Sequence, residues 1–103
     1  MNLDRIFDAL ASSPRRRVLA WLSQDELTTS ELAARAAMSA PAMSRHLSVL
    51  ENAGLAASRR QGQRVLYSLV RDTLVDALSG FAAELSPAER PKMSEIKAKR
   101  EAI

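Results

Sequence analysis

Residues 39–55 combine a helical apolar stripe with an opposite face of small polar side chains and one arginine. Met43, Leu47 and Leu50 recur at i, i+4 and i+7, which is the spacing of one face of an α-helix. The opposite face has no acid before Glu51, and consists of Ala40, Ser44, Arg45 and Ser48, with His46 at its edge. Short hydrogen-bonding side chains with one arginine suit insertion into a DNA major groove. The stretch is therefore predicted to contain a recognition helix.

His46 allows two interpretations on this helix. Its ring could donate a hydrogen bond to a phosphate or to a base acceptor. Alternatively, it packs at the edge of the helix beside Leu50. The spacing of residues leaves both alternatives open.

Local signals show where this helix begins and what precedes it. Ser39 is suited to be its N-cap, and Gly54 can take the left-handed conformation that ends a helix. Upstream, residues 28–31 read Thr-Thr-Ser-Glu, a capping box that predicts another helix over residues 29–37. A tight connection without the frequent glycine then leads to Ser39. Two short helices joined in this way indicate a helix-turn-helix.

A β-hairpin is predicted after the recognition helix, with strands over residues 55–60 and 64–70 and a turn at 61–63. Its basic side chains are expected to cluster around the tip, where they would straddle a phosphate backbone or enter a minor groove. The alternative is an edge hairpin that uses charge to prevent aggregation. The basic residues are Arg59, Arg60 and Arg64.

Two helices outside this basic region carry further apolar stripes. One is predicted over residues 2–11, and the other from Arg71 or Asp72 to about Leu85. We expect them to pack together and to form a two-fold dimer interface, the alternative being packing within one chain only. The predicted interface residues are Leu3, Ile6, Phe7, Leu10, Leu74, Leu78, Phe81 and Leu85.

Three consecutive arginines follow the first of these helices. Ser13 as N-cap and Pro14 at the first helical position predict the start of a second helix. Arg15, Arg16 and Arg17 then occupy its first turn, where positive charge opposes the helix macrodipole. Either these side chains bind phosphate, or they are merely solvated.

Length and charge distribution favour one small domain with a basic centre. The 103 residues predict one domain over residues 1–86 and a charged tail over 87–103. The formal net charge is only +3, but residues 14–71 hold nine arginines against four acids. A basic region of this kind is typical of a phosphate-binding surface. The expected fold class is mainly α with a small β-hairpin.

Several functional classes are excluded by composition. The chain has no cysteine, so it has no disulfide, zinc knuckle or thiol chemistry. One histidine and no cysteine cannot supply three or four nitrogen or sulfur ligands to a transition metal within one chain. An enzyme is not expected, because the lone histidine has no nucleophile partner and there is no phosphate-cradling glycine loop. No membrane span or signal segment is present, so a cytoplasmic protein without membrane partners is expected.

Three segments, taken in this order, resemble the ArsR–SmtB family of winged-helix transcriptional repressors. They are FDALASSPRRRVL at residues 7–19, MSRHLSVLENAGL at 43–55 and RRQGQRVLYSL at 59–69. The family often has glutamine where Ala40 stands and Asp-Pro where residues 12–13 stand. The resemblance implies a winged helix-turn-helix in which four helices precede the hairpin and one follows it.

The resemblance also implies a homodimer that represses transcription by placing two recognition helices in successive major grooves of double-stranded DNA. On that basis the groove-facing positions are Ser39, Ala40, Ser44, Arg45 and His46. The wing contacts are Arg59, Arg60, Gln63 and Arg64. The dimer would form through the first and last helices.

The sensing positions of the family differ in this chain. Thr28 and Ser30 stand where metal-responsive members have thiols, and the last helix has Asp72, Asp76 and Glu84 but no histidine. The resemblance thus indicates a repressor of the autorepressor type without cofactor, metal or thiol switch, relieved by a small molecule or a partner protein. The alternative function is a winged-helix adaptor that binds proteins and does not bind DNA specifically.

Overall fold

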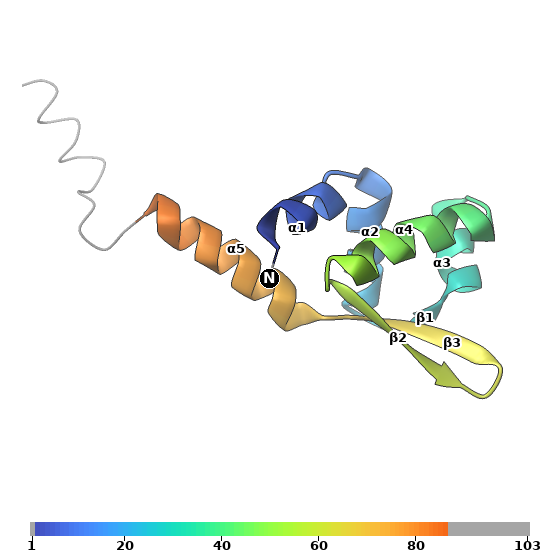
Figure 1. The fold of residues 1–103 in the computed structure, drawn as a ribbon. Helices are drawn as coiled ribbons and strands as arrows, with labels where there is room; N and C mark the ends of the chain where they lie inside the picture. The colour runs from blue at the N-terminus through green and yellow to red at the C-terminus, as the bar shows by residue number, and fades with distance from the viewer. Residues whose placement is uncertain (1, 87–103) are drawn as a thin grey trace, which may run out of the picture.

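The computed structural model describes residues 2–86 as five helices and a three-stranded antiparallel sheet (Figure 1). The predicted charged tail, residues 87–103, lies outside the described residues. The elements are α1 (Leu3–Leu10), α2 (Ser13–Leu22), β1 (Leu27–Thr28), α3 (Thr29–Ala36), α4 (Ala40–Asn52), β2 (Ala56–Gln61), β3 (Arg64–Leu69) and α5 (Arg71–Leu85). This order confirms the predicted fold class.

The sheet contains one short strand, β1, that the sequence pattern does not predict. β1 has only two residues and pairs with β3, Leu27 opposite Tyr67 and Thr28 opposite Leu66. Two residues are too few to show an alternating pattern, so only the pairing with β3 reveals the strand. The strand order is β1-β3-β2, which places the start of α3 beside the hairpin.

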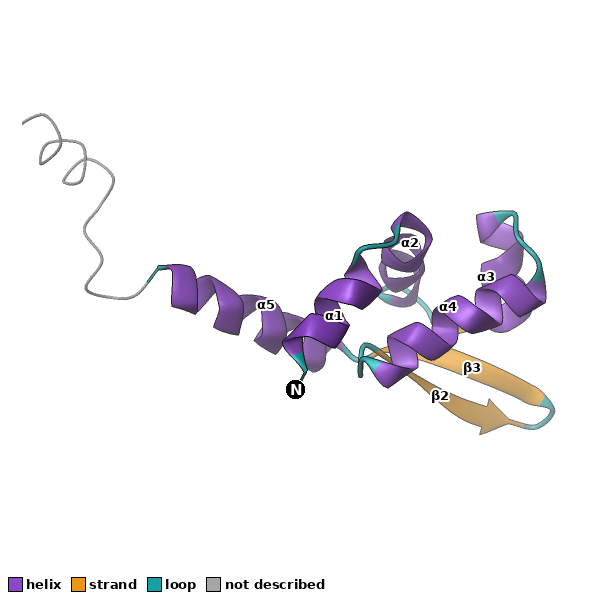
Figure 2. Ribbon diagram, turned by 45° about the horizontal axis from the view of Figure 1, so that its top comes forward, coloured by secondary structure: helices purple, strands orange, loops and turns teal. Residues whose placement is uncertain are grey.

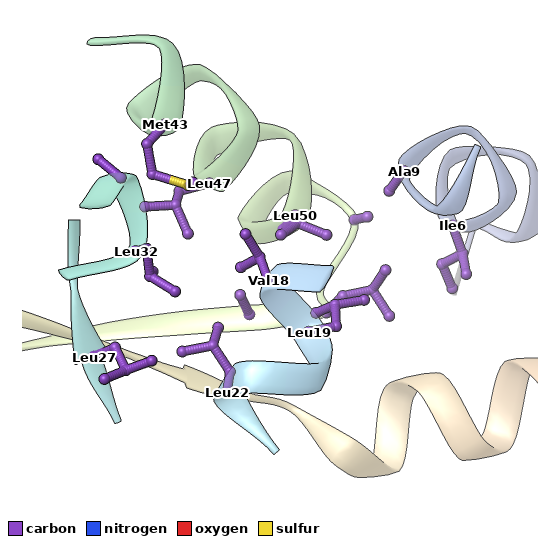
Figure 3. Packing of buried hydrophobic residues seen from close by; sticks show 14 of the residues in the cluster. Ile6, Ala9, Val18, Leu19, Leu22, Leu27, Leu32, Met43, Leu47 and Leu50 are labelled. Atoms are coloured by element: carbon purple, nitrogen blue, oxygen red, sulfur yellow. The ribbon is translucent and has the colours of Figure 1, made fainter. Parts of the chain in front are cut away.

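The core forms where α2, α3 and α4 meet, and α4 contributes its whole apolar stripe. Met43, Leu47 and Leu50 are 0% exposed, and their side chains point toward α2 and α3 (Figure 3). Leu32 and Val18, from those two helices, are also fully buried. Burying large apolar side chains contributes roughly 1.5–3 kcal/mol each. This packing fixes the rotation of α4 and turns its polar face to solvent.

Side-chain caps define the helix starts. The capping box of α3 is confirmed, because Thr28 Oγ1 accepts from the Glu31 backbone N–H and Glu31 accepts from the Thr28 N–H. Ser39 is the N-cap of α4, as predicted. The predicted N-cap of α2 was wrong by one residue: Ser12 caps the helix, and Ser13 is its first residue. Either serine could accept the bond, and the extended backbone of Ser12 selects it.

The joint between α3 and α4 is made without glycine. Ala37 takes the left-handed conformation, with φ of 53°, and its backbone N–H bonds back to the end of α3. Alanine adopts this conformation at a steric cost that glycine would avoid. Ala37 is the only non-glycine residue with positive φ among residues 2–86.

Arginines bind the C-terminal carbonyls of helices that lack a basic residue in their own last turn. Arg15 donates from Nε to the Ala9 carbonyl at 2.7 Å and from Nη2 to the Asp8 carbonyl at 2.9 Å. Arg16 donates to the Leu10 carbonyl at 2.6 Å. These bonds tie the start of α2 to the end of α1, where positive charge is favourable. Arg15 and Arg16 are therefore not merely solvated, because both bond to the end of α1; phosphate binding by these side chains stays a prediction.

The same arrangement recurs at two other helix ends. Arg5 of α1 donates to the Asn52 carbonyl at the end of α4, at 3.4 Å. Arg71 donates to the carbonyl of Ser23, the C-cap of α2, at 3.5 Å. Neither α2 nor α4 has a basic residue in its last turn. Long-range arginine contacts thus connect α1 to α4 and α5 to α2.

α5 packs on the body through only part of its apolar stripe. Ala77 is its one buried residue, and Phe81 meets the Phe7 ring edge-on with centroids 5.3 Å apart. Several large apolar side chains remain exposed: Val75, Leu78, Phe81 and Leu85. α5 and the β2–β3 hairpin extend from the helical body in opposite directions (Figures 1 and 2). The expected contact between the first and last helices is present.

One predicted interface residue has a different position. Ile6 is 0% exposed and belongs to the core of the single chain, so it offers no surface to a second copy. The apolar stripe of α1 was correctly recognised, but its period does not say which members face the chain's own core.

None of the helices in residues 2–86 is long and apolar enough to span a membrane.

Candidate nucleic-acid interface

The polar face of α4 is open to solvent along its length. Ser39, Ala40, Ser44 and Arg45 are all exposed, whereas the apolar side of the helix is fully buried. The Ser39 hydroxyl accepts from the Ala42 backbone N–H at 3.2 Å, which satisfies one amide at the start of the helix. The Arg45 side chain makes no hydrogen bond or ion pair within residues 2–86. Its five donors are available to a partner outside the chain.

His46 differs from its neighbours because it contacts the corner between α1 and α2. Its Nδ1 lies 3.4 Å from Arg15 Nη1, and the side chain is half-buried. Burial lowers the pKa of His46 below its ordinary value of 6.5, and the nearby Arg15 guanidinium lowers it further. A neutral ring can accept at Nδ1 from Arg15, which leaves the Nε2–H to be a donor. His46 therefore links the recognition helix to the residue that caps α1.

The hairpin separates its arginines between two faces instead of clustering them. Ser58 pairs with Tyr67, Arg59 with Leu66, Arg60 with Val65 and Gln61 with Arg64. Because paired residues share a face and successive residues alternate, Arg59 and Arg64 lie on one face and Arg60 on the other. On the Arg60 face, Ser58 Oγ donates to a Glu51 carboxylate oxygen of α4 at 3.2 Å. Arg60 thus shares the side of the sheet that faces α4.

The two arginines on the other face are paired with acids. Arg59 Nε donates to Glu26 Oε2 at 2.8 Å, and Arg64 Nη2 donates to Glu31 Oε1 at 3.3 Å. All four side chains are about half exposed, from 43% to 60%. Arg60 and Gln63 are exposed near the tip, where Gly62 turns with φ of +63°. Charge at the wing is therefore partly neutralised within the chain.

Within the described part of the chain, four arginine side chains of the basic centre have neither a hydrogen bond nor an ion pair. They are Arg17, Arg35, Arg45 and Arg60. Of these, Arg35 acts at longer range on the charge of Glu31. Arg35 was not among the predicted contacts, and Arg17 was left open between phosphate binding and solvation. Both lie outside the buried stripes of their helices, which the spacing of apolar residues in the sequence already shows. Of the nine arginines in residues 14–71, these four can therefore bind a phosphate without first breaking a hydrogen bond or ion pair within residues 2–86.

Comparison with known proteins identifies the family. Residues 12–58 match the family model described as bacterial regulatory protein, arsR family. A crystal structure of the ArsR family transcriptional regulator RHA00566 superposes with a TM-score of 0.76 at 32% identity, over 86% of this chain and 93% of that one. The chain belongs to the ArsR family. This ArsR-family protein is a DNA-binding transcriptional regulator and not an enzyme.

Two further relatives resemble this ArsR-family regulator over most of their length. The transcriptional repressor SdpR of Bacillus subtilis is 30% identical over 77 residues, which are 75% of this chain and 86% of SdpR. The homodimeric winged helix-turn-helix domain Mb0332 of Mycobacterium bovis was solved by NMR. It is 27% identical, with a TM-score of 0.66 and 86% of each chain covered. The family-model match, residues 12–58, includes α2, α3, α4 and the start of β2.

The acids and histidine of this ArsR-family regulator are dispersed. Among residues 2–86, no group of three or more such side chains is placed to hold a metal ion. Thr28 and Ser30, where metal-responsive members have thiols, line a polar hollow of about 360 Å³ between the start of α3 and the wing tip. Arg64 and Gln63 form the opposite wall of that hollow. The wing tip and the start of α3 are thus close neighbours.

Proposed function

We propose that this regulator is a homodimer that represses transcription by binding an inverted repeat in a promoter. The observation that carries the proposal is the polar face of α4, with unpaired Arg45, held outward by a fully buried stripe on its other side. An arginine on such a face can bond to guanine O6 and N7 in the major groove. Ser39, Ala40, Ser44 and His46 complete the proposed groove-facing set.

The wing supplies the second part of the proposed contact. Arg60 and Gln63 are exposed and unpaired near the tip, whereas Arg59 and Arg64 would have to exchange an acid for a phosphate. Phosphate contacts from such side chains position a protein on the duplex without reading sequence. In this arrangement α4 reads the bases and the wing holds the backbone beside them.

The dimer is proposed to form through α1 and α5. The exposed apolar side chains of α5 adjoin an apolar hollow of about 490 Å³ between α2, α5 and β3, lined by Leu10, Leu74 and Leu78 among others. A second copy covering this face would remove it from water. That Mb0332 is homodimeric supports a dimer, and the exposed apolar face of α5 supports this place for it. The proposed interface consists of Leu3, Phe7, Leu10, Leu74, Leu78, Phe81 and Leu85, without Ile6.

Relief of repression is proposed to need neither metal nor thiol. The sequence has no cysteine, and its one histidine is half-buried with Nδ1 beside Arg15. A small molecule or a partner protein is the proposed inducer. SdpR, a repressor of similar length, is consistent with the repressing role.

One pair of substitutions tests the dimer and DNA binding together. Leu78 is 43% exposed and lines the hollow, so Leu78→Asp should yield a monomer and lower affinity for inverted-repeat DNA more than tenfold. Ser79→Asp, one position along the same helix, is the matched control and should remain a dimer. Light scattering gives the mass. Gel shifts on DNA from the gene's own upstream region, with half-sites ~10 bp apart, give the affinity. A dimeric Leu78→Asp would contradict the proposed interface.

A further inference from the structure

Two acids outside the hairpin neutralise two of its three arginines. Glu26 precedes β1 and Glu31 lies in the first turn of α3, yet each is paired with a wing arginine 33 residues later in the chain. Both contacts exist because β1 pairs with β3 and brings the start of α3 against the wing. The pairing is thus a product of the sheet topology, and no local sequence pattern reveals it.

The two acids are held differently. Glu31 Oε1 also accepts from the Thr28 backbone N–H at 3.0 Å as part of the capping box, so its position is fixed independently of Arg64. These backbone and hydroxyl bonds with Thr28 lower the pKa of Glu31, and the Arg64 and Arg35 charges lower it further. The Glu31 carboxylate therefore stays ionised through neutral pH. Glu26 makes its one side-chain contact, within residues 2–86, with Arg59.

We propose that Glu26 and Glu31 are specificity-determining residues, which withhold Arg59 and Arg64 from sequence-independent binding of phosphate by the wing. This inference rests on the proposed DNA-binding function and concerns the same surface. Non-specific affinity grows with the number of phosphates that a protein neutralises, whereas specificity depends on the ratio of operator binding to non-specific binding. Pairing two wing arginines with acids lowers the affinity for non-specific DNA, and it leaves the base contact proposed for Arg45 of α4 unchanged.

The strength of the pairs fits such a role. Half-exposed ion pairs contribute little to folding, so the acids are not required to hold the wing in place. The arginines can exchange a carboxylate for a phosphate when the operator brings the backbone close, because both partners are similar anionic acceptors. On the other face, Arg60 makes no hydrogen bond or ion pair within residues 2–86, so its donors are available to any duplex. In this proposal Arg60 contacts the phosphates of any duplex, whereas Arg59 and Arg64 contact them only after release from Glu26 and Glu31.

Glutamine substitutions remove the charge while keeping the shape. Glutamine at position 31 still serves the capping box, so Glu31→Gln should fold normally. Asp25→Asn is the matched control: it changes the net charge equally and lies beside Glu26, but its side chain makes no hydrogen bond or ion pair in the described residues. Thermal unfolding confirms that all variants are folded before binding is compared.

The test measures binding of a scrambled duplex and of the operator duplex over a range of salt concentrations. Glu26→Gln and Glu31→Gln should each tighten scrambled-DNA binding by roughly three- to fivefold and steepen the slope of log K against log salt by about 1.8 for the dimer, which is one new phosphate contact per chain, with less gain on the operator. Equal behaviour of these variants and Asp25→Asn would overturn the inference, even if the operator is bound well.

A double-mutant cycle locates the effect on the arginine. Arg64→Gln should weaken scrambled-DNA binding more in the Glu31→Gln background than in the natural sequence. An identical loss in both backgrounds would contradict masking. Absence of salt-dependent DNA binding in every variant would instead overturn the proposed function, so the two failures are distinguishable.

Discussion

Arginine has opposite roles in two neighbouring regions of this molecule. At the corner between α1 and α2, Arg15 and Arg16 bond to the last carbonyls of α1 at 2.6–2.9 Å and are part of the framework. On the surface made by α4 and the wing, Arg45 and Arg60 have no partner within residues 2–86. A high density of arginine in one region of the sequence therefore does not by itself indicate a phosphate-binding surface. Each side chain's existing hydrogen bonds decide which role it has.

His46 lies between the two regions. It belongs to α4, but its ring meets Arg15 at the corner. The corner also lies beside the α1 helix through which we propose the dimer forms.

Loss of the framework arginine is expected to give the largest effect on folding. Arg15→Ala should lower the free energy of unfolding by about 1.5–3 kcal/mol, because hydrogen bonds from a charged donor to two carbonyls are lost. Chemical denaturation at fixed protein concentration measures it. Arg17→Ala, two residues later, is the control and should change stability by less than ~0.5 kcal/mol. Equal unfolding free energies for the two variants would contradict the claim that Arg15 stabilises the fold and Arg17 does not.

Loss of the surface arginine on α4 should leave folding intact and change recognition. Arg45→Ala is expected to reduce discrimination between operator and scrambled DNA by about 1–3 kcal/mol per half-site, since a base contact is removed. Competition gel shifts report this ratio, and denaturation should show an unchanged unfolding free energy. If discrimination stays constant while stability falls, Arg45 belongs with the framework arginines instead.

Arg60 should affect affinity without affecting discrimination. Arg60→Ala is expected to weaken operator and scrambled DNA alike and to flatten the slope of log K against log salt by about 1.8 for the dimer, because one phosphate contact per chain is lost. Fluorescence anisotropy across a salt series measures both quantities. A loss confined to the operator would show that Arg60 reads bases.

The smallest expected effect is a pH dependence at the junction of the regions. The pKa of His46 is lowered in the folded chain, mainly by burial, so the unfolded chain binds its proton more tightly. Its contribution to stability is therefore complete above about pH 6.5 and is lost as pH falls through the lower folded value. Denaturation between about pH 7 and pH 5 should show the decline, and His46→Gln should reduce it. An unchanged pH profile in His46→Gln would exclude this histidine as the source.

Much of the fold could be predicted because it depends on local patterns. The stripe of Met43, Leu47 and Leu50 predicted both the helix and its buried face, and residues 28–31 predicted the cap of α3. β1 could not be predicted, since a strand of two residues exists only through its partner. The apolar stripe of α1 was recognised, but not that Ile6 belongs to the chain's own core.

The candidate site was only partly predictable for a related reason. The partners of Arg15, Arg59 and Arg64 lie on other elements, so no spacing in the sequence reveals them. One signal was present and missed: Arg59 and Arg60 are consecutive in a strand, and consecutive strand residues must point to opposite faces. The separation of the wing arginines follows from that alternation alone.

The most direct test follows the arginine side chains themselves during DNA binding. Nε–H resonances of each arginine can be observed by NMR as an inverted-repeat duplex is added. We predict that the Nε–H signals of Arg45 and Arg60 shift strongly, while those of Arg15 and Arg16 stay where they are in the protein without DNA. Movement of Arg15 and Arg16 with no change at Arg45 and Arg60 would contradict it.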